Sequence, residues 1–147
     1  MPLEVEVVSR VRKLYHTDKA TMVIIPGSEG EMGVLPHHTP LLTTLAYGEL
    51  RIIEDGDVVS FVVYGGVVDV RPDKVIVLAE DAESATEISQ DEINAARDRA
   101  QQLMSEHPTP EQRAEIQQEL RRAEIMARVQ NRLGAERHRI RTVDDDH

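Results

Sequence analysis

Residues 58–78 read VVSFVVYGGVVDVRPDKVIVL. Three runs in this stretch, residues 58–64, 67–70 and 74–78, are rich in β-branched side chains and have the length of a strand. Pro72 and Asp73 favour a type I turn between the last two runs. Gly65 and Gly66 favour a bulge or bend, because neither a helix nor a Lys-Ser/Thr pair follows them. The stretch therefore predicts consecutive strands with a bend between the first two.

Similar apolar runs lie upstream, at residues 4–8, 22–25 and 50–53. Asp55 and Gly56 suit a tight hairpin turn between the last of these runs and residues 58–64. Many short strands at close spacing, with no helical period between them, are typical of an antiparallel sandwich or a flattened barrel. The sequence thus predicts an antiparallel β-sandwich of about ten short strands over residues 1–86.

The composition changes near residue 87. Seven of the eight glycines and all four aromatic residues precede residue 89, whereas ten arginines and no lysine follow it. A chain of 147 residues can form one ordinary domain or two small ones. The change of composition favours two domains.

The second part of the chain carries two helix signals. Ser89 can cap a helix with Glu92 three residues later, and Pro108 disfavours helix at the residue before it. Thr109 can cap a second helix, with Gln112 completing another capping box. The turn between the two is very short, so residues 87–141 are predicted to form an antiparallel two-helix hairpin. The fold class is therefore α+β.

The predicted faces of the hairpin are rich in alanine. Residues at helical spacing include Ala96 and Ala100 on the first helix, and Ala123 and Ala127 on the second. Small side chains let two helices approach closely but bury little apolar area, at roughly 25 cal/mol per Å². Two interpretations stay open: a hairpin that can open, and a stable appendage.

Charge supplies a second clue. Because 27 acidic residues outnumber 17 basic ones, the chain is not expected to bind nucleic acid. Residues 120–141 nevertheless have a net charge of +5. The pattern fits either a solvated helix face or a site for an acidic protein partner, since guanidinium groups pair with carboxylates. The arginines are Arg121, Arg122, Arg128, Arg132, Arg137, Arg139 and Arg141.

Enzymatic sites were sought in the segment GEMGVLPHHTPLL, residues 30–42. His37 and His38 are adjacent, but neighbouring residues of a strand point to opposite faces and make a poor metal chelate. The sequence has no cysteine, nucleophile elbow, phosphate-binding glycine loop or metal-spaced His/Glu motif. A metal-dependent enzyme centred on the two histidines is the weakest of the alternatives. We expect a contact loop, with no catalytic residue and no metal.

Three motifs then carry a family resemblance: GSEGEMGVLPHHTPLLTTLAYGELRI at residues 27–52, YGGVVDVRPDKVIVLAEDA at 64–82, and RAEIMARVQNRL at 122–133. Their order and spacing resemble the epsilon subunit of bacterial F-type ATP synthase over essentially the whole chain. The resemblance implies that residues 1–86 bind the gamma subunit and the c ring in the rotating central stalk. It implies that residues 87–141 are a regulatory hairpin, which folds down or extends to inhibit ATP hydrolysis, and that residues 142–147 are an acidic tail.

By position in this family, Glu31 and His38 are implied to face the c ring. Arg121, Arg122, Arg128 and Arg132 are implied to meet an acidic segment of the catalytic beta subunits. The resemblance further implies a subunit without an active site, held peripherally on the cytoplasmic side of the inner membrane. The amino-terminal residues lack a long apolar run, so no direct lipid insertion is expected.

The sequence departs from the family in two places. His37 stands where the family commonly has Gly. Some members bind ATP at a motif Ile/Leu-Asp-x-x-Arg-Ala, for which this chain has ISQDEI at residues 88–93. Ile88 matches, but Glu92 puts a negative charge where a phosphate would approach. Because of this charge, no cofactor is expected. Arg99 and Arg128 are the remaining candidates to bind a nucleotide, and an ATP-sensing module is the alternative function.

Overall fold

The computed structural model describes the backbone of residues 2–145 and the side chains of residues 2–133. The chain divides into two compact units, Met1–Thr86 and Glu87–His147. The first unit is built of strands and the second of helices, so the division falls where the amino-acid composition changes.

The first unit contains eight strands within the described residues. Hydrogen bonding links them in the order β2-β1-β7-β6-β5-β3-β4, with β8 paired to β6. The prediction of a β-sandwich is confirmed. The strands are β1 (Leu3–Val8), β2 (Lys13–Ala20), β3 (Met22–Gly27), β4 (Gly30–Val34), β5 (Leu41–Glu54), β6 (Asp57–Val70), β7 (Lys74–Ala79) and β8 (Ala82–Ser84), followed by the 3-10 turn η1 (Ala85–Glu87).

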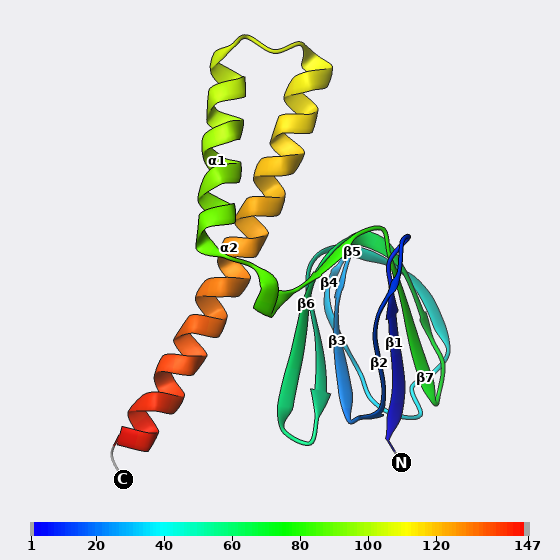
Figure 1. Ribbon diagram of the computed structural model, residues 1–147. Helices are drawn as coiled ribbons and strands as arrows, with labels where there is room; N and C mark the ends of the chain where they lie inside the picture. The colour runs from blue at the N-terminus through cyan, green and yellow to red at the C-terminus, as the bar shows by residue number, and fades with distance from the viewer. Residues whose placement is uncertain (1, 146–147) are drawn as a thin grey trace. The chain divides into compact units, whose positions relative to one another are not determined.

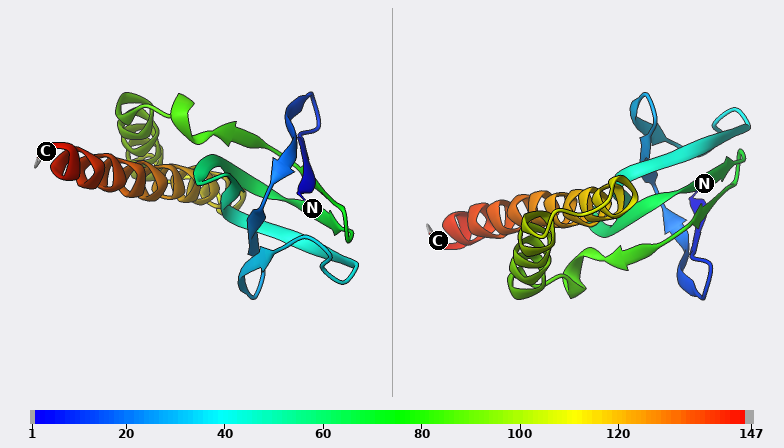
Figure 2. Two further views of the ribbon diagram at one scale, coloured as in Figure 1. Left: turned by 90° about the horizontal axis from the view of Figure 1, so that it is seen from below. Right: turned by 90° about the horizontal axis from the view of Figure 1, so that it is seen from above.

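A long hairpin of β5 and β6 joins the two layers of this sandwich (Figures 1 and 2). Each strand has 14 residues, and they pair in one register from Leu41 with Val70 to Glu54 with Asp57. Residues 61–63 of β6 pair with β8, whereas residues 66–70 pair with β7. Each end of the hairpin therefore belongs to a different layer.

The change of layer takes place at two glycines of β6. Gly65 has φ +85° and Gly66 has φ +135°, a region that side chains with a Cβ rarely adopt. A Cβ on Gly66 would lie 2.1 Å from the carbonyl oxygen of Leu78 on β7. Only glycine fits here, and the bend predicted from the Gly-Gly pair is confirmed.

Two features of the sheet differ from the prediction. The predicted runs 58–64 and 67–70 form one bent strand, and the described residues contain eight strands instead of about ten. β1 and β7 pair in parallel, although the sandwich was expected to be antiparallel throughout. Parallel pairing is possible because the chain between them is long enough to cross to the other layer and return.

The core lies between the two layers. β1 alternates buried and half-buried residues, with Leu3, Val5 and Val7 fully buried, as expected for a strand with one face inward. They join Ile25 and Leu50 of the other layer in one apolar cluster. Each fully buried Leu, Ile or Val of this kind stabilises the fold by about 1.5–3 kcal/mol.

The second unit is a hairpin of α1 (Gln90–Ser105) and α2 (Pro110–Asp145), shown in Figures 1 and 2. The Ser89 hydroxyl accepts the backbone N–H of Glu92 at 3.2 Å. The Thr109 hydroxyl accepts the N–H of Gln112 at 3.2 Å, and the Gln112 side chain accepts the N–H of Thr109 at 3.0 Å. Both predicted helix starts are thus confirmed. No described helix is both long and apolar enough to span a bilayer.

Small and medium apolar side chains hold the hairpin together. Ile93 and Ala100 of α1 are buried, as are Ile116, Ala123 and Ala127 of α2. The guanidinium of Arg97 donates two hydrogen bonds, of 2.8 and 3.2 Å, to the Glu124 carboxylate. The Gln130 side chain donates to the carbonyl oxygen of Ile88 at 3.3 Å.

The helix assignment also bears on the predicted acidic tail. The backbone of α2 continues through Asp145, so residues 142–145 belong to this helix. The last two residues of the predicted tail, 146–147, lie outside the described part of the chain. The side chains of Arg137, Arg139 and Arg141 also lie outside it.

Candidate functional site

The segment between β4 and β5 contains a reverse turn over residues 35–38. The N–H of His38 donates to the carbonyl oxygen of Leu35 at 3.2 Å. Pro36 occupies the second position, and His37, in the third, has φ +69°. A proline followed by a residue with positive φ is typical of a type II turn.

His37 is held in this conformation by a second segment. Its N–H donates to the carbonyl oxygen of Pro72 at 2.7 Å, which ties the turn to the connection between β6 and β7. Its side chain is exposed. A residue with a Cβ loses roughly 1–2 kcal/mol in the left-handed region, so the turn is strained where glycine would be relaxed. This explains physically why Gly suits the position.

Replacing His37 with Gly should therefore stabilise the chain. We expect a gain of about 1 kcal/mol in the free energy of unfolding, because the backbone strain disappears while an exposed side chain is lost. Urea denaturation of the purified protein measures it. His38→Gly is the matched control and should bring no gain, since His37, Asp55 and His107 are the residues other than glycine whose φ is positive among those described. Equal effects of the two substitutions would contradict the turn geometry.

His38 presents one ring nitrogen to a fixed partner. Its Nδ1 lies 2.7 Å from the carbonyl oxygen of Thr39, which can only accept, so Nδ1 carries the proton and donates. In the neutral ring Nε2 is then an acceptor. The residue is only half-buried, so Nε2 can meet a donor on a partner.

Glu31 lies on β4 with 61% of its side chain exposed. Its carboxylate is bound by the guanidinium of Arg51 on β5, where Nη2 donates to Oε2. Glu31 and His38 thus belong to one segment but have different contacts, Arg51 for the first and Thr39 for the second. The sequence prediction identified Glu31 but missed its partner.

Exposed apolar side chains surround this segment. Leu35 is 56% exposed and Leu42 is 70% exposed. Strand register places Val67 beside Leu78. Both side chains point outward from the layer that also contains Leu42. We call Leu42, Val67 and Leu78 the apolar patch. Exposed apolar side chains gathered on neighbouring strands are suited to contact with another protein. The sequence analysis missed the patch. Its signal is nevertheless present, because the runs VVDV and KVIVL place apolar residues on the outward face as well as on the inward one.

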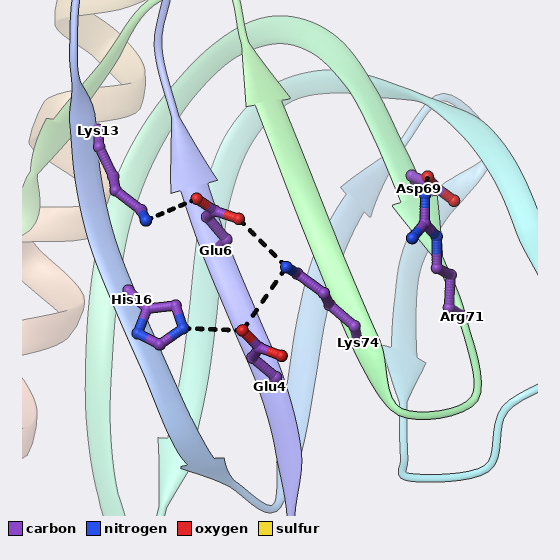
Figure 3. A network of polar contacts seen from close by, with 7 residues as sticks. All are labelled: Glu4, Glu6, Lys13, His16, Asp69, Arg71 and Lys74. Atoms are coloured by element: carbon purple, nitrogen blue, oxygen red, sulfur yellow. Dashed lines mark hydrogen bonds and ion pairs between the residues drawn. The ribbon is translucent and has the colours of Figure 1, made fainter.

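The rest of that outer face is charged (Figure 3). The Lys13 ammonium lies 2.8 Å from the Glu6 carboxylate, and His16 lies 2.9 Å from Glu4. Lys74 lies 3.5 Å from each of the two glutamates. The five side chains come from β1, β2 and β7 and form a row of alternating acidic and basic groups, here called the row of charges, in which His16 is charged only when it is protonated. This outer face thus carries the apolar patch on β5, β6 and β7 and charged side chains on β1, β2 and the start of β7, and Asp69 of β6, which pairs with Arg71 at 2.9 Å, adds a further charge.

The row affects the titration of its two carboxyl groups. The hydrogen bond from His16 is the main cause that lowers the pKa of Glu4, and that from Lys13 lowers the pKa of Glu6. A lowered pKa in the folded chain favours folding above the unfolded pKa, and this contribution is lost as pH falls through the folded pKa. Both carboxylates are partly exposed to solvent, at 39% for Glu4 and 20% for Glu6, so salt weakens these pairs.

The arginines predicted to contact a partner lie on α2. Arg121 and Arg128 are exposed, whereas Arg122 and Arg132 are half-buried. At 100° per residue Arg121, Arg128 and Arg132 share one helix face, and Arg122 lies about a quarter turn away. We call these four residues the arginine face. It is built on a rigid helix and can meet a row of carboxylates.

Two of the residues proposed for nucleotide binding, Ile88 and Arg99, lie in different surroundings. Ile88 is 8% exposed and meets Gln130 of α2, whereas Arg99 is exposed in the middle of α1. At 1.5 Å per residue Arg99 lies about 14 Å along the axis of α1 from its first residue. A groove of about 400 Å³ between the helices is lined by other residues. They are Arg97, Ala100, Gln101, Met104, Ile116, Gln117, Leu120 and Glu124.

A metal ion needs several ligands that converge on one point. Within the described part of the chain, no group of three or more His, Asp or Glu side chains is placed to hold a metal ion. His37 and His38 are turned differently by the type II turn, with one exposed and the other bound to Thr39.

Comparison with known proteins decides the family. The family model described as ATP synthase, Delta/Epsilon chain, beta-sandwich domain matches residues 2–85. The ATP synthase epsilon chain of Acidithiobacillus ferridurans is 42% identical over 120 residues, which cover 82% of this chain and 84% of the relative. This chain belongs to the ATP synthase epsilon chain family. The epsilon chain of Dehalococcoides mccartyi is 40% identical over 128 residues, covering 86% of this chain and 91% of its own.

Solved structures agree with the epsilon-chain fold. A chain in the mitochondrial ATP synthase of Euglena gracilis, described as OSCP/F1/c-ring, has a TM-score of 0.66 at 22% identity, with coverage of 92% of this chain and 81% of that chain. A chain of the central stalk and c ring of Tetrahymena thermophila ATP synthase has a TM-score of 0.53 at 18% identity, covering 62% and 72%. The resemblance predicted from the three sequence motifs is confirmed by the family match.

Proposed function

We propose that this epsilon chain is a rotor subunit of the central stalk, which couples the gamma subunit to the c ring and inhibits ATP hydrolysis through its hairpin. It has no active site of its own and works peripherally on the cytoplasmic side of the inner membrane. The observation that carries the proposal is the pairing of two separately built units. One unit displays a contact loop and an apolar patch, and the other displays an arginine face.

The sandwich supplies the attachment. The apolar patch of Leu42, Val67 and Leu78 is suited to a protein surface that remains covered in the assembly. The row of charges beside it fixes the register of docking, because like charges brought together are costly. We assign this face to gamma. The loop with Glu31 and His38 is assigned to the polar end of the c ring, where an exposed carboxylate and a ring nitrogen offer polar contacts.

The hairpin supplies the regulation. Ala100, Ala123 and Ala127 bury little area in its interface, and the Arg97–Glu124 pair is partly exposed, so it adds only about 0–1 kcal/mol. The larger buried side chains include Ile93 and Ile116, so opening the hairpin has a limited cost that an interaction with the catalytic head can offset. The hairpin then acts as a two-state element whose extended form blocks rotation in the direction of hydrolysis.

The arginine face supplies the inhibitory contact with an acidic segment of the beta subunits. Replacing Arg121, Arg122, Arg128 and Arg132 with Ala should relieve inhibition, because the charge is lost while alanine keeps the helix. We expect the ATPase rate of the reconstituted enzyme to rise about 5-fold or more, and the salt dependence of inhibition to flatten. Arg113→Ala, an exposed arginine at the start of α2, is the control and should change neither. Inhibition that persists in the quadruple variant with its salt dependence intact would refute the charge mechanism.

The alternative, an ATP-sensing module, gives a different result in calorimetry. We expect no measurable heat when ATP is titrated into the isolated chain, because Glu92 is exposed at the position of the motif arginine and repels a phosphate. Glu92→Arg is the matched variant, since it restores the attractive sign. A clear heat for the parent chain, with low-millimolar or tighter affinity, would favour the sensing module instead.

A further inference from the structure

We propose that Arg51 is a positioning residue for Glu31, which holds the Glu31 carboxylate in place to receive a cationic side chain of the partner. The inference rests on the proposed function, in that Glu31 is taken as a contact residue of the sandwich. It adds a residue from another strand to the contact, and it names the chemistry that the partner must present.

Strand register brings the two side chains to the same face. Glu31 on β4 is opposite Pro26 of β3, and Arg51 on β5 is opposite Ile24 of β3. Residues 24 and 26 are two apart, so they share a face, and β3 lies between the interacting side chains. Since strands are about 4.8 Å apart, the pair spans about 10 Å of sheet. Arginine has the length to cross β3, and its Nη2 donates to Glu31 Oε2.

Arg51 is the fixed member of the pair. Its side chain is 25% exposed, compared with 61% for Glu31. Its Nε lies 3.8 Å from Oε1 of Glu49, which is itself only 13% exposed. The guanidinium is thus mostly covered and lies in ion-pair range of Glu49, while its outer nitrogen donates to Glu31. The less exposed Arg51 side chain thus restrains the more exposed Glu31 carboxylate.

The pair contributes more to binding than to folding. A partly exposed ion pair stabilises a fold by only about 0–1 kcal/mol. An unrestrained glutamate, however, loses about 0.5–1.5 kcal/mol of side-chain entropy when a partner fixes it. If Arg51 has already ordered the carboxylate, that cost falls on folding instead of binding. The difference corresponds to about 2- to 12-fold in affinity, at about 1.4 kcal/mol per factor of ten.

The remaining acceptor capacity defines the partner. An ionised carboxylate has about four lone-pair sites, and one hydrogen bond from Arg51 leaves room for another donor. A second guanidinium or an ammonium group satisfies it, because a charge-assisted bond to carboxylate is short and strong. The partner surface at Glu31 should therefore carry an Arg or Lys side chain.

The test measures binding of the assembled complex of gamma and this chain to purified c ring at low and moderate salt. Glu31→Gln should weaken binding and flatten its salt dependence. Arg51→Gln should weaken it about 2- to 12-fold in the parent and have no further effect in the Glu31→Gln background. Arg51→Lys should retain part of the affinity. Lys19→Gln, which removes one exposed charge from β2, should bind like the parent, and thermal unfolding shows that each variant is folded.

The outcomes separate the inference from the function on which it rests. If Glu31→Gln weakens binding but Arg51→Gln binds like the parent, the positioning role is overturned and the contact at Glu31 stands. An equal loss from Arg51→Gln with and without Glu31 also overturns it. If Glu31→Gln itself binds like the parent, the c-ring contact of the proposed function is overturned together with the inference.

Discussion

A chain shortened to residues 1–86 should fold, assemble into the synthase and leave ATP hydrolysis uninhibited. The sandwich keeps its own apolar core, which includes Val5, Ile25 and Leu50 and contains no residue of the hairpin. It also keeps the apolar patch and the loop with Glu31. Only the two-state element and its arginine face are removed, so attachment and inhibition are separated in one variant.

The ATPase rate of enzyme reconstituted with the shortened chain measures the effect. We expect the rate to rise about 5-fold or more over that of enzyme with the full chain. A change of this size corresponds to the coupling free energies of about 1–3 kcal/mol that are typical of regulation. Gel filtration with gamma controls for assembly, and circular dichroism controls for folding. A shortened chain that assembles normally but leaves hydrolysis unchanged would show that the hairpin does not inhibit.

The Gly66→Ala substitution should abolish or nearly abolish folding of the sandwich. The added Cβ would lie 2.1 Å from the Leu78 carbonyl oxygen and 2.9 Å from the Cα of Ala79, both backbone atoms that cannot move alone. The strain of φ +135° adds to the clash. We expect a loss of more than about 3 kcal/mol, a large part of the stability of a domain of about 85 residues.

Gly30→Ala is the matched control for this prediction. Gly30 has φ +123°, close to that of Gly66, but its Cβ would meet no atom within 4 Å. We expect a loss of only about 1–2 kcal/mol from backbone strain, and about 4–8 °C in Tm for each kcal/mol in a domain of this size. Thermal unfolding of the two variants compares them directly. Equal losses would contradict the close packing of β6 against β7 at the bend.

The local features of the fold could be predicted because short-range chemistry determines them. The caps at Ser89 and Thr109, the stop before Pro108, and the turn at Asp55 and Gly56 each depend on a few neighbouring residues. Asp55 and Gly56 have φ +48° and +88°, as a two-residue hairpin turn requires. Such signals survive in any tertiary context.

The strand count was wrong for a reason that involves the whole sheet. Gly65 and Gly66 interrupt the apolar run, and a single sequence cannot show whether the chain continues in the same strand beyond them. Pairing with all of β5 keeps β6 continuous. β2 was missed because its sequence, KLYHTDKA, is mostly polar and gains its order from pairing with β1.

The side-chain contacts around the candidate site could be predicted only in part. Glu31 and His38 could be assigned from a linear motif, but the contact of Glu31 with Arg51 joins residues 20 apart on strands that β3 separates. The role of His37 needed its φ value, because the sequence shows a missing glycine without showing the turn. Features that depend on register and backbone angle therefore came from the structure.

Isolation of the chain from its own cells tests the central claim most directly. We would place an affinity tag at the amino terminus, solubilise the membranes in mild detergent and identify what is retained. We expect the tagged chain to retain the gamma subunit at one copy per chain, together with c-ring and beta subunits. Recovery of the chain alone, from cells in which the intact synthase can be isolated, would contradict its place in the central stalk.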